Sequence, residues 1–174
     1  FGENSRIDVG GLVATTSNIS NDDFMFGNYK FDLPSSVNRT IINRGTINVA
    51  QGGLLAFIAP GVANSGIINA QLGQVSLASG KTFTLDLYGD KLVSLGVDSK
   101  ILEQVIGPDG KPVSSLIKNG GSIQANGGSV YLEVNAARNV VDQVINMDGL
   151  VEAKTAIQKN GEIILYGGDE GLVN

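Results

Sequence analysis

The chain of 174 residues is 42% hydrophobic and carries a formal net charge of −5 at pH 7, which indicates one folded domain with a sizeable core. It has no Cys and no His, which excludes a Ser-His-Asp triad, a Cys nucleophile and any zinc or copper site with His or Cys ligands. The acidic balance and the scattering of the 12 Lys and Arg residues speak against nucleic acid as a partner.

In chain order, the first predicted element is a pair of short strands at residues 7–14. A polar and then aromatic stretch at residues 16–36 follows, and it breaks the pattern seen in the rest of the chain. Its aromatic residues alternate with others, which predicts a hairpin; they are Phe24, Phe26, Tyr29 and Phe31. This hairpin is expected to cover or cap the first part of the fold, or else to dock on a partner.

A short pattern then recurs, consisting of Asn, a turn pair rich in Gly, and an apolar residue four positions after the Asn. Copies begin at Asn43, Asn64 and Asn119, and a degenerate copy begins at Asn146. Strands are predicted after the first three copies, and second strands follow glycine-containing corners, at residues 47–49, 68–70, 123–125, 54–58, 75–77, 130–134 and 163–166. The long gap between Asn64 and Asn119 holds either about two repeats or one repeat plus an insertion.

Short strands at this spacing, separated by Gly and Asn corners, predict an all-β fold: a parallel β-helix, a single-stranded solenoid of stacked coils. The interior row is expected to contain Ile47, Ile68, Ile123 and Leu150. A sandwich of antiparallel hairpins is the alternative, because it also uses short strands and turns.

The asparagines of the repeat are interpreted as a structural corner ladder, in which stacked amides bond from one coil to the next. The members of this predicted ladder are Asn43, Asn64, Asn119 and Asn146. A row of binding residues is the alternative. A second excursion from the trunk is expected at residues 88–118, with a short helix near 99–106.

Several stretches together resemble the secretion domain of two-partner-secreted exoproteins, the haemagglutination activity domain family. This group contains filamentous haemagglutinin, high-molecular-weight adhesins, contact-dependent growth-inhibition proteins and pore-forming haemolysins. The resemblance is carried by residues 1–16, 19–31, 43–66 and 75–87. It implies a right-handed β-helix with extra-helical hairpin and loop excursions, export through the periplasm, and passage through an outer-membrane transporter whose periplasmic domains bind this region.

The Asn-Pro-Asn-Gly motif that the family carries just upstream of Phe1-Gly2 is absent here. Residues 1–174 are therefore interpreted as a single secretion domain, a fragment that lacks its N-terminal cap and the downstream region.

The resemblance leads to the hypothesis of a monomeric secretion and recognition module that is not embedded in the membrane. The module would be the folding nucleus of a secreted or surface-displayed β-helical adhesin fibre, a virulence protein that binds host-cell or bacterial receptors. A cytolysin or a contact-dependent inhibition toxin is an alternative parent. A carbohydrate-active β-helix enzyme is the remaining alternative, but the sequence shows no recurring Asp at outward strand positions. We expect no catalytic residue, cofactor or metal site.

Overall fold

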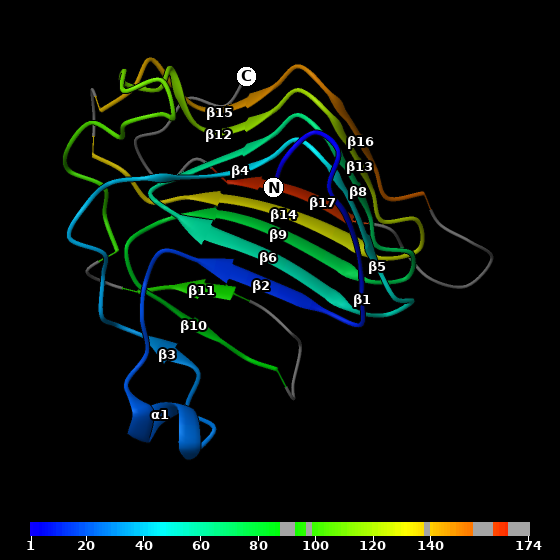
Figure 1. Cartoon of the computed structure of the whole chain (residues 1–174), viewed down its shortest axis with the longest axis horizontal. Coiled ribbons are helices and arrows are strands. Elements are labelled where there is room, and N and C mark those ends of the chain that lie inside the picture. Colours follow the sequence, from blue (N-terminus) through cyan, green and yellow to red (C-terminus); the bar gives the residue numbers. More distant parts are fainter. Residues whose placement is uncertain (88–92, 97–98, 138–139, 155–161, 167–174) are drawn as a thin grey trace.

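The computed structural model describes residues 1–87, 93–96, 99–137, 140–154 and 162–166. Three parallel β-sheets form the trunk of the protein (Figure 1). The first sheet has the order β1-β5-β8-β13-β16. Its strands are Arg6–Val9, Thr46–Val49, Ile67–Asn69, Ser122–Gln124 and Leu150–Glu152.

The second sheet has the order β17-β14-β9-β6-β2, and the third has the order β15-β12-β7-β4. The strands of the second sheet, from β2 to β17, are Leu12–Thr15, Leu54–Ala59, Gln74–Ser79, Ser129–Val134 and Glu162–Tyr166. Those of the third, from β4 to β15, are Thr40–Asn43, Gly61–Asn64, Ser115–Asn119 and Gln143–Met147.

The chain visits the three sheets in turn, so that each passage β4-β5-β6, β7-β8-β9, β12-β13-β14 and β15-β16-β17 is one coil. Neighbouring coils pair in parallel, with Ile47 beside Ile68 and Ile68 beside Ile123. The predicted parallel β-helix is therefore confirmed, and the antiparallel sandwich is wrong for the trunk. Because β8 pairs directly with β13, the long gap in the repeat contains one coil plus an insertion.

Alternating side chains along each strand fill the interior of the trunk. Ile47, Ile68 and Ile123 have no exposed surface, and the residues that alternate with them along each strand point outward. Burial of an aliphatic side chain of this size contributes roughly 1.5–3 kcal/mol, so a stacked row of them gives the trunk its main stabilisation. One coil could not enclose these side chains alone, because its neighbours form the remaining walls.

Leu150 does not lie in the interior row, and its predicted position there is wrong. It pairs with Ser122 and is 48% exposed, whereas Val151 pairs with Ile123 and takes the inner position. Side chains alternate between the two faces of a strand, so an error of one residue exchanges inside and outside.

The corners bring the backbones of successive coils into close contact at a column of glycines. A Cβ atom at Gly66 would overlap the carbonyl oxygen of Gly45, and one at Gly121 would overlap that of Gly66. Gly149 has the same relation to Gly121. Glycine is thus required at this position because the next carbonyl fills the space of any side chain.

A small antiparallel sheet covers the outer face of part of the second parallel sheet. Its order is β11-β10-β3, and its strands are Val93–Leu95, Phe83–Leu85 and Lys30–Phe31. It buries the outward residues Leu54, Ala56 and Ile58, which explains why every residue of β6 is buried. Figure 1 shows this sheet beside β2, with α1 (Asn21–Met25) projecting beyond β3.

The helix predicted near residues 99–106 is absent. Ile101 instead forms a parallel bridge with Ala136, and its backbone bonds to Asn135 and Ala137 at 2.8 Å each. These contacts with the next coil occupy the backbone groups that a helix would need. Of the wider excursion predicted at 88–118, residues 88–92 and 97–98 lie outside the described residues.

Candidate partner-binding surfaces

Three asparagines of the predicted corner ladder stack in consecutive coils. Asn43 Nδ2 donates to Asn64 Oδ1 at 2.8 Å, and Asn64 Nδ2 donates to Asn119 Oδ1 at 2.8 Å. Asn43 Oδ1 also accepts from the Gly45 amide at 3.1 Å. All three residues are at most 1% exposed, so their amides are satisfied inside the protein and have no contact with solvent.

Asn146 does not join this ladder, and its predicted place there is wrong. It pairs with Lys118, while Met147 pairs with Asn119. The repeat of the fourth coil begins at Met147, because Gly149 then falls in the glycine column. Asn146 Oδ1 is buried and has no hydrogen-bond partner among the described residues.

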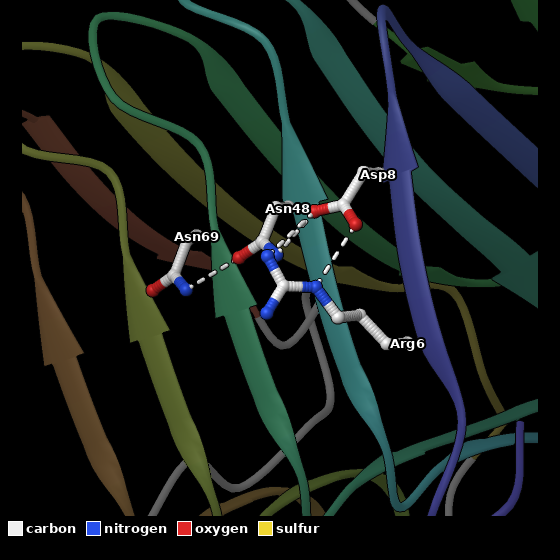
Figure 2. A network of polar contacts seen from close by, with 4 residues as sticks. All are labelled: Arg6, Asp8, Asn48 and Asn69. Atoms are coloured by element: carbon white, nitrogen blue, oxygen red, sulfur yellow. Dashed lines mark hydrogen bonds and ion pairs between the residues drawn. The ribbon is translucent and has the colours of Figure 1, made fainter.

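A second ladder lies on the outer face of the first sheet, and Figure 2 shows it from close by. Asn69 Nδ2 donates to Asn48 Oδ1 at 2.8 Å, and Asn48 Nδ2 donates to Asp8 Oδ1 at 2.6 Å. Arg6 Nε donates to Asp8 Oδ2 at 2.9 Å, and this bond, followed by that from Asn48, lowers the pKa of Asp8. Sequence analysis missed this ladder, although Asp8, Asn48 and Asn69 each follow an inward Ile of the repeat.

The predicted hairpin of aromatic residues is also wrong in its secondary structure. Residues Asn21–Met25 form the helix α1, because the Ser20 side chain accepts from the Asp23 amide at 3.0 Å and caps the first turn. The acidic side chains of Asp22 and Asp23 also stabilise this first turn, because the N-terminal end of a helix carries a partial positive charge.

The four aromatic residues of this segment divide into two pairs. Phe31 stacks on Phe83 with ring centroids 4.4 Å apart, and Tyr29 packs against the same outer cluster. Phe24 and Phe26 instead lie on α1 and at its end, and they are 60% and 80% exposed. Met25 between them is 79% exposed, so these three residues form an apolar knob on the surface.

The base of this segment is closed by an antiparallel bridge. The Asn18 amide donates to the Leu33 carbonyl at 2.7 Å, and the Leu33 amide donates back at 3.3 Å. The apolar knob is therefore presented on a short projection that is fixed at both ends. This arrangement is suited to contact with another molecule.

The acidic side chains that the structure describes are dispersed. Among them, no three acidic side chains gather closely enough to hold a metal ion. None of the described helices has the length and apolar character needed to cross a bilayer.

Replacing Asn64 by Leu should lower the free energy of unfolding by about 2–3 kcal/mol. It leaves Asn119 Oδ1 buried without its partner and leaves Asn43 Nδ2 with only its 3.3 Å bond to the Gly45 carbonyl. Asn69→Leu is the matched control on the outer ladder, and it should lose no more than about 1 kcal/mol. Urea unfolding of both variants measures the difference. Equal losses would show that the buried ladder does not stabilise the trunk.

Glu133 in β14 should make stability depend on pH, because burial raises the pKa of its carboxyl. A raised folded-state pKa means that the ionised form is disfavoured in the folded protein, so stability falls as pH rises above the ordinary value of 4.5. Glu133→Gln should therefore be more stable than the parent at pH 7, and its unfolding temperature should be higher. The gain in the free energy of unfolding should be less than about 1 kcal/mol. Thermal unfolding followed down to pH 3 should show this difference disappearing; a difference that is constant with pH would contradict the assignment.

Comparison with known proteins gives a family match over the whole chain. The family model described as TPS secretion domain matches residues 1–174. The structure is similar to the crystal structure of the HMW1 secretion domain from Haemophilus influenzae, with a TM-score of 0.71 and 24% sequence identity. That similarity covers 94% of this chain and 39% of the solved chain, and it concerns the fold. Comparison with curated proteins gave no match.

Proposed function

The chain belongs to the TPS secretion domain family, the two-partner secretion family that its sequence resembles, and from this premise we propose that an outer-membrane transporter recognises it through the apolar knob. The family is one of secretion domains and not of enzymes. This membership implies a secreted exoprotein that is exported through the periplasm. The proposed partner is the set of periplasmic domains of the transporter.

The apolar knob carries this proposal. Phe24, Met25 and Phe26 are adjacent in sequence and all largely exposed, although Tyr29 and Phe31 of the same segment are partly buried against the outer cluster. Single exposed apolar residues are common on proteins, but a contiguous group on a fixed projection is typical of a docking site. Large aromatic side chains also supply much of the binding energy at protein interfaces.

We further propose that the trunk is the folding nucleus of the exoprotein. Among the described strands, β15, β16 and β17 lie at the ends of their sheets, so each has one edge without a neighbour. Such an edge presents backbone donors and acceptors to any further coil in parallel register. Pairing of each newly emerged coil outside the cell would then oppose its return through the transporter.

The remaining parts of the proposal concern the architecture and the parent protein. We propose a right-handed winding, because crossovers between parallel strands are almost always right-handed. We also propose a single domain over residues 1–174, supported by one continuous interior cluster from Ile47 to Ile145. The parent would be a monomeric surface adhesin that binds host cells or other bacteria. In a cytolysin or a contact-dependent inhibition toxin, the role of this domain would be unchanged.

The double variant Phe24→Ser/Phe26→Ser should bind the purified periplasmic domains of the cognate transporter about tenfold more weakly, as expected for loss of an aromatic hot spot. Transporter-dependent release of the parent exoprotein should fall with it. The thermal midpoint of the purified domain should not change, because both side chains are largely exposed.

Leu102→Ser is the control, since Leu102 is 66% exposed but lies outside the knob. It should bind and be released like the parent. Calorimetric titration measures the binding, and immunoblotting of the culture medium measures release. Unchanged affinity and release in the double variant would contradict recognition through the apolar knob.

A further inference from the structure

A groove with a volume of about 520 Å³ lies beside the third sheet. One wall is formed by residues of β4, β7 and β12, including Ile42, Ala63 and Lys118. The other wall is the loop 107–114, which leads into the first residues of β12. This size is within the range of about 300–1,000 Å³ that is usual for small-ligand sites.

The loop that forms the second wall is held in place by its own hydrogen bonds. The Gly107 amide donates to the Lys111 carbonyl at 2.8 Å, and the Val113 amide donates to the Val105 carbonyl at 3.0 Å. Gly110 adopts a φ of 76°, a left-handed conformation that favours glycine in this turn. The groove is thus shaped before any ligand arrives.

Three cationic side chains line the groove, although the chain as a whole is acidic. Arg44, Lys111 and Lys118 make no ion pair with any other residue that the structure describes. Among the described residues that line the groove, Asp109 is the one acidic residue, and its Oδ1 accepts from the Lys111 amide at 3.1 Å. Unpaired positive charges on the walls of one groove raise the local concentration of anions.

We propose that this groove binds a small oxyanionic ligand, whose carboxylate or phosphate groups are held by Arg44, Lys111 and Lys118. Charge-assisted hydrogen bonds to such oxygens are the strongest that these side chains form. A small ligand fits better than an anionic polymer, because the cations belong to one groove and do not continue as a stripe along an acidic protein. The proposal does not depend on recognition by the transporter.

The test is a titration of the isotope-labelled domain followed by NMR, with citrate and inorganic phosphate as separate probes at constant ionic strength. Saturable shifts are expected at the groove, including the backbone amides of Ser65 and Gly120. Lys118→Gln should weaken the binding of the better probe by about tenfold, the effect of losing one charge-assisted bond. The probe that binds more tightly identifies a carboxylate or a phosphate as the preferred group.

One further variant separates a ligand site from ordinary solvated surface charges. Asp109→Asn keeps the acceptor of the turn and removes the only acidic lining charge, so it should tighten binding by about threefold or more.

Lys30→Gln is the matched control. Lys30 lies on β3, outside the groove, and its Nζ pairs with Asp32 Oδ2 at 3.1 Å. It should leave probe binding unchanged. The proposal is overturned if neither probe gives saturable shifts at the groove, or if Lys118→Gln and Lys30→Gln weaken binding equally. Binding of an acidic peptide without binding of either small probe would also overturn it.

Discussion

The whole trunk depends on the close approach of successive backbones at its corners. Parallel strands lie about 4.8 Å apart, and a β-helix must keep that spacing through every turn as well as along every strand. The glycine column meets this requirement, since the carbonyl of Gly45 fills the space where a Cβ at Gly66 would lie, and the relation repeats at Gly121. The buried amides from Asn43 to Asn119 then satisfy the polar groups that this approach removes from water.

The sequence pattern was sufficient to predict the trunk because the same requirement applies in every coil. An Asn and a Gly at fixed positions before an inward Ile indicated both the parallel stacking and the buried row. The prediction failed by one residue in the fourth coil, where Met147 replaces the Asn and Gly149 keeps its place. The glycine is therefore the more reliable marker, because steric overlap leaves it no substitute, whereas a buried amide can be replaced by an apolar side chain.

The excursions were less predictable, because their structure depends on contacts that the repeat does not encode. Alternating aromatic residues at 24–31 suggested a hairpin, but the cap at Ser20 favours a helix and separates the exposed pair from the partly buried pair. The groove cations were equally hidden, since Arg44, Lys111 and Lys118 are scattered in sequence. They meet only because the loop 107–114 lies against strands from three coils.

Interior stacking stabilises the trunk, whereas recognition is the role that we propose for the projecting segments. The central claim is that coils distant in sequence stack in parallel register. Nuclear Overhauser contacts in the isotope-labelled domain test it most directly. The account predicts contacts between the methyl groups of Ile68 and both Ile47 and Ile123, together with one-sided parallel contacts between their strands. Contacts of antiparallel pairing among these residues, or none between Ile68 and Ile123, would contradict it.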